Sequence, residues 1–278
     1  IFIGGESPIT VQSMLNAKSS DLAENVKQGR ELEDSGCDII RVSVPDEESV
    51  KLIYALKENL SIPVVADIHS NHRLAIKAVE AGVDKIRINP GNIGSNENIK
   101  SVADVCNKKN IPIRIGVNSG SVEKKILSEY GGATPEALCK SAIYNVSLLE
   151  KFDFNNIVIS AKSSNVKDTV EAYGMIARSC DYPLHLGITE TGTEKMGILK
   201  SAAGIGSLLL NGIGDTIRIS LTASPVKEVE IGINLLKALG LRNGVDIISC
   251  PTCGRTRIDI AGIVNSVESR LRNYCEKS

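Results

Sequence analysis

Five cationic side chains each stand alone inside short apolar runs that recur along the chain. A charge in such a run is costly unless a partner or solvent at a site compensates for it. An ion pair with a nearby carboxylate would explain any single arginine as well as a binding site would. For the five cations together, however, the only obvious carboxylate partners are Asp67, Glu190 and Asp215. Guanidinium forks match phosphate oxygens. We therefore expect a diphosphate or bisphosphate ligand, bound by Arg41, Arg87, Arg114, Lys162 and Arg218.

Other polar residues stand at or just beyond the ends of the same runs. Asp67 and His69 could perform acid–base chemistry, or they could orient the arginines. Asn118 and Ser220 could bind an anion with their side chains. His185 lies within the apolar run that starts near Pro183, and Glu190 lies at the end of that run.

A glycine-rich turn, Asn89-Pro-Gly-Asn-Ile-Gly94, follows the run that contains Arg87. Its backbone N–H groups could bind an anion. A tight turn between a strand and a helix explains the same residues equally well. The turn matches neither the phosphate loop of nucleotide hydrolases nor the dinucleotide fingerprint.

The spacing of Cys250 and Cys253 in Cys-Pro-Thr-Cys is compatible with three kinds of chemistry. The pair could be half of a zinc site, a redox dithiol or two ligands of an iron–sulfur cluster. The residues alone leave these readings open. The chain has seven cysteines, and an odd number argues against a disulfide framework. We expect four others to be small buried apolar residues: Cys37, Cys106, Cys139 and Cys180.

The apolar runs alternate with amphipathic helical patterns, which predicts a parallel α/β sheet. Eight nearly equal units favour closure into a (β/α)₈ barrel over an open, doubly wound sheet. In such a barrel, residues at the carboxyl ends of the strands face the active site, and this places the five cations together. The expected strands are Ile9–Met14, Asp38–Val44, Pro63–Ile68, Lys85–Asn89, Pro112–Asn118, Asn156–Lys162, Pro183–Thr189 and Asp215–Leu221.

The repeat ends near Asn243, where we place a domain boundary. Residues 1–243 form the predicted substrate-binding barrel, and residues 244–278 begin a second, incomplete α/β domain. We expect a short strand over Val245–Ser249 and a helix from about Ile258 to Asn273.

Composition excludes several classes of protein. The net charge of −1, the 3% aromatic content and the absence of Trp do not suit a nucleic-acid binder. No apolar run reaches the roughly 18 residues of a membrane span. No targeting segment is visible, although both ends appear trimmed, and we expect a bacterial cytoplasmic location.

Nine motifs in order resemble those of the bacterial two-domain 4-hydroxy-3-methylbut-2-enyl diphosphate synthases. The resemblance runs from end to end. The motifs are Pro8-Ile-Thr-Val-Gln-Ser-Met14, Arg41-Val-Ser-Val-Pro45, Ala66-Asp-Ile-His69, Ile86-Arg-Ile-Asn-Pro-Gly-Asn-Ile-Gly94, Ile113-Arg-Ile-Gly-Val-Asn-Ser-Gly-Ser121, Ser160-Ala-Lys-Ser163, His185-Leu-Gly-Ile-Thr-Glu190, Gly212-Ile-Gly-Asp-Thr-Ile-Arg-Ile-Ser220 and Ser249-Cys-Pro-Thr-Cys-Gly-Arg255.

This resemblance implies an iron–sulfur oxidoreductase of isoprenoid biosynthesis. The family carries out the reductive ring opening and dehydroxylation of 2-C-methyl-D-erythritol 2,4-cyclodiphosphate in the methylerythritol phosphate pathway. It works as a homodimer with flavodoxin or ferredoxin as electron donor. The implied catalytic residues are Asp67, His69 and Glu190, and the implied substrate-binding residues are Arg41, Arg87, Arg114, Asn118, Lys162, His185, Arg218 and Ser220.

The family binds a [4Fe–4S] cluster with three cysteines and one glutamate. Cys250 and Cys253 match the first two ligands, whereas the motif of the third cysteine and the glutamate are absent from this chain. Cys275 stands in the wrong motif and receives no ligand role. We therefore expect the chain to be inactive by itself. The alternatives are a redox-inert barrel of the pterin-synthase type, which leaves the cysteine pair unexplained, and a zinc-binding module, which leaves the cations unexplained.

Overall fold

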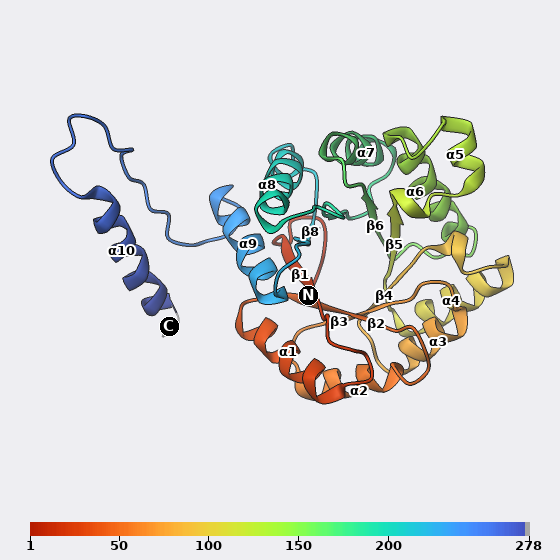
Figure 1. Cartoon of the computed structure of the whole chain (residues 1–278). Helices are drawn as coiled ribbons and strands as arrows, with labels where there is room; N and C mark the ends of the chain where they lie inside the picture. Colours follow the sequence, from red (N-terminus) through yellow and green to blue (C-terminus); the bar gives the residue numbers. More distant parts are fainter. Residues whose placement is uncertain (276–278) are drawn as a thin grey trace. The chain divides into compact units, whose positions relative to one another are not determined.

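The computed structural model describes the backbone of residues 1–275 and the side chains of residues 1–271. The side chain of Cys275 and residues 276–278, which end the second predicted domain, lie outside the described part. The chain divides into two compact units, residues 1–242 and residues 243–278 (Figure 1).

Residues 1–242 form a ring of eight parallel strands in the order β6-β5-β4-β3-β2-β1-β8-β7. A parallel bridge between Ile159 and Leu184 brings β6 next to β7 and completes the ring. The predicted (β/α)₈ barrel is confirmed. The strands are β1 (Thr10–Met14), β2 (Ile39–Ser43), β3 (Val64–Asp67), β4 (Lys85–Ile88), β5 (Ile113–Asn118), β6 (Ile157–Lys162), β7 (His185–Leu186) and β8 (Thr216–Ile217).

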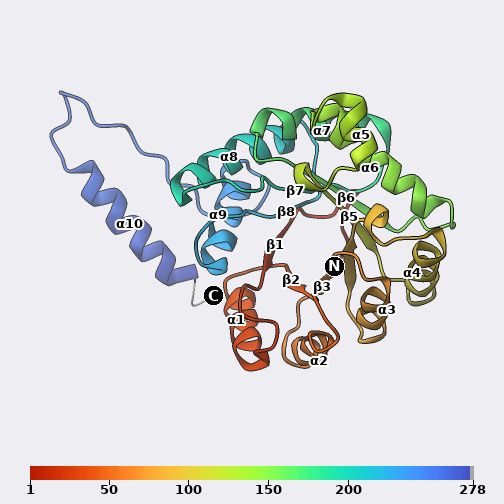
Figure 2. The ribbon, with the colours of Figure 1, turned by 45° about the vertical axis from the view of Figure 1, so that its right-hand side comes forward.

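Helices surround the strands on the outside (Figure 2). Several begin where a Ser, Thr or Asn side chain accepts a backbone N–H of the first turn, as Ser95 and Thr134 do. The helices of this unit are α1 (Leu22–Asp34), α2 (Val50–Asn59), α3 (His72–Glu80), α4 (Asn96–Lys109), α5 (Lys124–Tyr130), α6 (Pro135–Glu150), α7 (Val166–Ser179), α8 (Glu194–Leu210) and α9 (Pro225–Ala238), with 3₁₀ turns η1 (Pro90–Asn92) and η2 (Ser119–Ser121). The short helix α5 was not predicted from the sequence.

Successive residues of a strand point to opposite sides, which divides the strands of the barrel into two faces. On β4, Ile86 and Ile88 belong to the apolar core between strands and helices. The alternate residues Lys85 and Arg87 therefore point into the ring, and both are buried. The register places Arg87 beside Arg114 of β5. The same alternation that builds the core thus brings cations into the barrel interior.

Aspartates fasten the amino-terminal ends of three strands. Each follows a helix-to-strand turn, and its carboxylate accepts the backbone N–H of a residue in or beside the neighbouring strand. Gly36 and Gly82 allow two of these turns because their φ angles are +85° and +89°. The three contacts are Val11 N to Asp38 Oδ2 at 2.8 Å, Val64 N to Asp84 Oδ2 at 2.7 Å, and Leu184 N to Asp215 Oδ2 at 2.7 Å.

Two expectations about strands need correction. Strands β7 and β8 are two residues long rather than seven, although their ladder continues through bonds such as Arg218 N to Leu186 O at 3.0 Å. Just before β7, Pro183 has no N–H to donate to the ladder. Val245–Ser249 forms no strand. No neighbouring strand pairs with it in the described part of its unit, and an unpaired strand is not stable.

The second unit contains helix α10 (Ile260–Cys275), preceded by irregular chain that carries Cys250 and Cys253. Apolar side chains of this unit, including Ile248 and Ile263, are exposed. Among the described residues of the whole chain, no helix has both the length and the hydropathy needed to cross a membrane.

Replacing Asp84 by Ala should lower the free energy of unfolding by about 2 kcal/mol, because Val64 N–H loses its acceptor inside a buried strand end. Lys57, whose Nζ lies 2.7 Å from Asp84 Oδ2, would lose its partner as well. Urea denaturation would measure the change. The control is Asp104→Ala, which removes an exposed carboxylate from α4. Equal urea midpoints for the two variants would contradict the role of Asp84.

Candidate active site

Asp67, at the end of β3, binds two of the predicted arginines. Its Oδ2 accepts Arg41 Nη2 at 2.6 Å, and its Oδ1 accepts Arg87 Nη1 at 3.1 Å. Burial alone would raise the pKa of Asp67, but the two guanidinium groups outweigh burial and hold the pKa well below its usual range. Asp67 is therefore ionised at neutral pH and joins β2, β3 and β4 at the carboxyl end of the barrel.

Arg87 occupies space that a glycine of the neighbouring strand leaves open. Its Nη2 donates to the carbonyl oxygen of Gly116 at 2.8 Å. A Cβ atom at position 116 would lie 2.0 Å from Arg87 Nε, which is closer than any real contact. Gly116 is thus required by the arginine that lies against it.

Arg114 is the most buried of the cations, with 1% of its surface exposed. Its Nε and Nη1 have no hydrogen-bond partner among the described residues. Burial and the nearby charges of Arg41 and Arg87 lower the pKa of Arg114 well below its usual value. A buried guanidinium with free donors and like charges around it is a strong site for an anion.

Lys162 and His185 lie on the next two strands of the ring, β6, which pairs with β5, and β7. Burial, followed by the charges of Arg114 and Arg218, lowers the pKa of Lys162. A Cβ atom on Gly187, which directly follows β7, would lie 2.6 Å from Lys162 Nζ and 2.9 Å from the Arg218 carbonyl oxygen, so a side chain at this position would crowd Lys162.

His185 is fully buried, and its Nδ1 lies 3.4 Å from Thr216 Oγ1. Its Nε2 has no partner among the described residues. Burial, with the nearby charges of Arg114 and Lys162, lowers the pKa of His185 well below its usual value. The imidazole is therefore neutral at pH 7.

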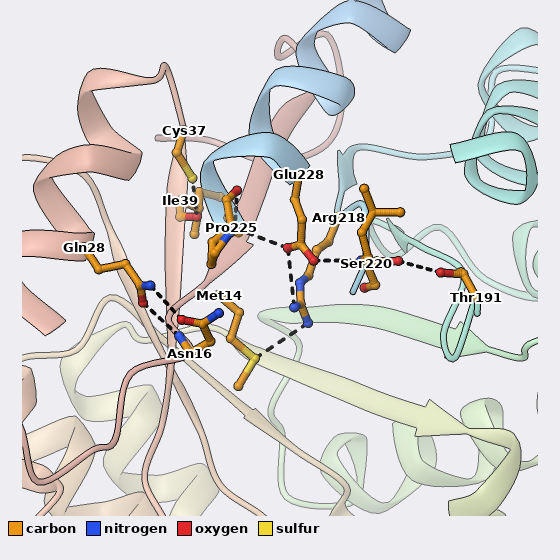
Figure 3. Close-up of polar contacts among 12 residues, drawn as sticks. Met14, Asn16, Gln28, Cys37, Ile39, Thr191, Arg218, Ser220, Pro225 and Glu228 are labelled. Atoms are coloured by element: carbon orange, nitrogen blue, oxygen red, sulfur yellow. Dashed lines mark hydrogen bonds and ion pairs between the residues drawn. The ribbon is translucent and has the colours of Figure 1, made fainter. Parts of the chain in front are cut away.

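Arg218, just beyond β8, contacts a carboxylate from helix α9 (Figure 3). Its Nη2 lies 3.7 Å from Glu228 Oε2, and its Nη1 lies 3.6 Å from Met14 Sδ. Burial raises the pKa of Glu228, and the Arg218 guanidinium opposes that shift. The Nε of Arg218 has no partner among the described residues, so this donor is also free.

Ser220 and Asn118 are half-buried in the loops after β8 and at the end of β5. The carbonyl oxygen of Ser220 accepts Thr191 Oγ1 at 2.8 Å, which joins the loops that follow β7 and β8. Asn118 is the N-cap residue of η2, and its backbone N–H donates to Ser121 Oγ at 2.9 Å. Both loops are thus ordered around the ring of cations.

His69 and Glu190 differ from the rest of the predicted set because both side chains are exposed. Neither makes a hydrogen bond or an ion pair with the described side chains. Glu190 has a φ angle of +52°, a left-handed conformation that is uncommon for glutamate. Such strain is often found at functional sites. The two residues follow β3 and β7, at the same end of the barrel as the cations.

Three buried polar residues of the barrel unit were not among the predicted site residues. The side-chain amides of Asn89 and Gln12 are buried, and all four of their polar atoms lack partners among the described residues. Glu228 is buried on a helix. Strand alternation could have indicated Gln12 and Asn89, which stand two residues from Met14 and Arg87. No local pattern identifies Glu228, because its partners come from β1 and the loop after β8.

Cys250 and Cys253 are exposed and lie outside the barrel unit. Hydrogen bonds from Arg255 and Thr256 lower the pKa of Cys253, which favours the thiolate that binds metals. No group of three or more His, Cys, Asp or Glu side chains suited to a metal ion is present in the described part of the chain. Two thiols therefore fit one half of a four-ligand site, and the described part of the chain does not complete it.

The cup, defined here as Arg41, Asp67, Arg87, Arg114, Lys162, His185 and Arg218, has more positive than negative charge. Asp67 pairs with Arg41 and Arg87, and Glu228 lies beside Arg218. Arg114 and Lys162 have no carboxylate partner among the described residues. The cup can therefore bind a ligand with more than one negative charge.

Replacing Gly116 by Ala should displace Arg87, break its bonds to Asp67 and to residue 116, and lower the free energy of unfolding by about 2 kcal/mol. Chemical denaturation would measure the loss. Gly206→Ala is the matched control, because its Cβ would lie 3.9 Å from Leu235 in ordinary contact. If Gly116→Ala were as stable as Gly206→Ala, Arg87 would not be confined as described.

Comparison with solved structures supports the fold alone. Dihydropteroate synthase of Yersinia pestis superimposes with a TM-score of 0.60 at 13% identity, covering 84% of this chain and 92% of that one. The 3-dehydroquinate dehydratase of Geobacillus kaustophilus superimposes with a TM-score of 0.59 at 14% identity, covering 86% and 94%.

Comparison with sequences identifies the family. A family model described as the GcpE TIM-barrel domain matches residues 1–233. Curated relatives named 4-hydroxy-3-methylbut-2-en-1-yl diphosphate synthase (flavodoxin) include those of Caldanaerobacter subterraneus subsp. tengcongensis, 58% identical over 96% of this chain and 76% of the relative, and Fusobacterium nucleatum, 54% identical over 99% and 78%. That of Clostridium perfringens is 51% identical over 100% and 80%. The chain belongs to the GcpE family of 4-hydroxy-3-methylbut-2-en-1-yl diphosphate synthases.

Proposed function

We propose that the cup binds 2-C-methyl-D-erythritol 2,4-cyclodiphosphate and that the protein opens its ring reductively to give 4-hydroxy-3-methylbut-2-enyl diphosphate. The relatives are named as synthases of this product. The observation that carries the proposal is the buried Arg114, whose free donors face a surplus of positive charge. A cyclic diphosphate supplies the two negative charges that such a cup needs.

In this proposal the cations bind and orient the two phosphates. Arg114 and Arg218 offer free guanidinium donors. Burial and the neighbouring cations lower the pKa of Lys162, whereas a bound anion would favour its charged form, which contributes a point charge. Neutral His185 can donate one hydrogen bond without adding charge. Asn118 and Ser220 stand at the ordered loops around the cup and complete the set of predicted substrate ligands.

The loss of the hydroxyl as water requires a proton, for which the chain offers three predicted acid–base residues. Asp67 is held ionised by two arginines, so its geometry favours orientation of Arg41 and Arg87 over proton donation. His69 and Glu190 are exposed at the same end of the barrel and have no competing partner among the described side chains. These two are therefore the better candidates for proton transfer.

A [4Fe–4S] cluster, when bound, supplies the two electrons and a Lewis-acidic iron. Cys250 and Cys253 would provide two of its thiolate ligands, and their exposure leaves both sulfurs accessible. The remaining cysteine and glutamate ligands come from outside this chain. We propose flavodoxin as the electron donor, because the relatives' names specify it, with ferredoxin as the alternative, and a homodimer as the working assembly.

Replacing Arg114 or Lys162 by Ala should weaken binding of the cyclodiphosphate at least about tenfold, because each removes a charge-assisted contact. Isothermal titration calorimetry on the 278-residue chain would measure the affinity. Lys100→Ala, which removes an exposed charge from α4, is the control. If both cup variants bound like the control, the assignment of the cup would be wrong.

The full-length protein, produced anaerobically, should contain iron and sulfide and absorb broadly in the visible range. Cys250→Ala and Cys253→Ala should each abolish the absorption, because each removes one ligand and leaves the cluster incompletely coordinated. Cys180→Ala, which alters a half-buried cysteine of the barrel unit, should leave it unchanged. Zinc alone, or no metal, in the unsubstituted protein would contradict the proposal.

A further inference from the structure

Glu228 is a buried carboxylate that no sequence motif pointed to, and only 5% of its surface is exposed. It stands in the first turn of α9, where the helix dipole favours a negative charge. Since α9 lies on the outer layer of the barrel, this carboxylate reaches the cup from behind the strands. The question is what it holds in place.

Its two oxygens contact three residues of two other segments (Figure 3). Oε1 accepts the N–H of Leu221 at 2.8 Å. Oε2 accepts the hydroxyl of Ser13 on β1 at 3.5 Å and lies 3.7 Å from Arg218 Nη2. Ser13 also lies 3.4 Å from the carbonyl oxygen of Pro225, so it ties the start of α9 to β1. One side chain thus connects β1, α9 and the chain that follows β8.

Both predicted ligands that follow β8 depend on these contacts. Arg218 has no other carboxylate partner among the described residues, and its Nε is free. Ser220 directly precedes Leu221, and its own carbonyl oxygen is held by Thr191. The Leu221 N–H and the Ser220 carbonyl oxygen belong to the same peptide unit. Because both are hydrogen-bonded, the backbone that carries the Ser220 hydroxyl is held in place.

We propose that Glu228 is a positioning residue that aims Arg218 and the Ser220 backbone at the bound diphosphate. This inference rests on the proposed function. Glu228 does for this side of the cup what Asp67 does for Arg41 and Arg87. The two carboxylates differ in one respect: Asp67 lies inside the ring, whereas Glu228 acts from the helix layer and leaves the ring open to the ligand.

A positioning role and a simple charge-balancing role predict opposite results for Glu228→Gln. Gln keeps an oxygen for Leu221 N–H but removes the negative charge. If Glu228 only offset positive charge, its loss would strengthen binding of an anion. If it positions Arg218, its loss frees the guanidinium, and the affinity for the cyclodiphosphate should fall about tenfold, the value of one charge-assisted contact.

A double-mutant cycle tests whether the effect passes through Arg218. The affinity of the 278-residue chain for the cyclodiphosphate is measured by calorimetry for Glu228→Gln, Arg218→Met and the double variant. The expected result is that Glu228→Gln costs about tenfold in the parent but less than about twofold in the Arg218→Met background. Glu230→Gln, the same change at an exposed site of α9, should bind like the parent.

In the full-length enzyme, Glu228→Gln should raise KM and leave kcat within about twofold, because Arg218 holds the phosphates in the ground state and the transition state alike. Unchanged or tighter binding, an equal loss in both backgrounds, or a lower kcat at constant KM would overturn the inference. If Glu228→Gln did not fold, Ser13→Ala would take its place, with an expected loss of about threefold and unchanged affinity as the contrary result. Failure of the unsubstituted chain to bind would overturn the proposed function and this inference together.

Discussion

The two ion pairs of Asp67 are the interaction on which the rest of the site depends. Arg41, Arg87 and Arg114 converge on a buried space in which their like charges repel. Asp67 holds the first two at 2.6 and 3.1 Å and stays ionised because they surround it. Arg114, without a carboxylate partner among the described residues, is left with free donors. The site is therefore assembled around one carboxylate but remains short of negative charge, and the missing charge is what a ligand can supply.

The two ends of the barrel perform different tasks. At the amino-terminal ends of the strands, Asp38, Asp84 and Asp215 accept strand N–H groups and fix the register. At the carboxyl ends, Gly116 and Gly187 leave room for large cationic side chains. A register that shifted by one residue would turn Arg87 and Arg114 toward the helices. The register fixed at the amino-terminal end of the barrel thus determines which side chains face the site at its carboxyl end.

Membership in the GcpE family gives this arrangement its chemical meaning. The cyclic diphosphate of the proposed reaction has the charge that the cup lacks, and the reductive step explains why a cysteine pair accompanies a phosphate-binding barrel. The likeness to dihydropteroate synthase, at 13% identity, extends to the fold only. In the proposed function, the exposed thiols of Cys250 and Cys253 are two of the cluster's ligands.

The sequence by itself determined the barrel, because eight local alternations of strand and helix leave few ways to bury their apolar faces. It also indicated the cations, since a charge within an apolar run is visible without knowing its neighbours. Strand ends were less predictable: β7 and β8 are short, and Val245–Ser249 is not a strand, because a strand exists only where a partner pairs with it. Only the tertiary structure decided which charges meet. The register of three strands places Asp67 between Arg41 and Arg87, and Glu228 reaches Arg218 from the helix that follows β8. Such contacts depend on distances across the barrel, which no local pattern of residues encodes.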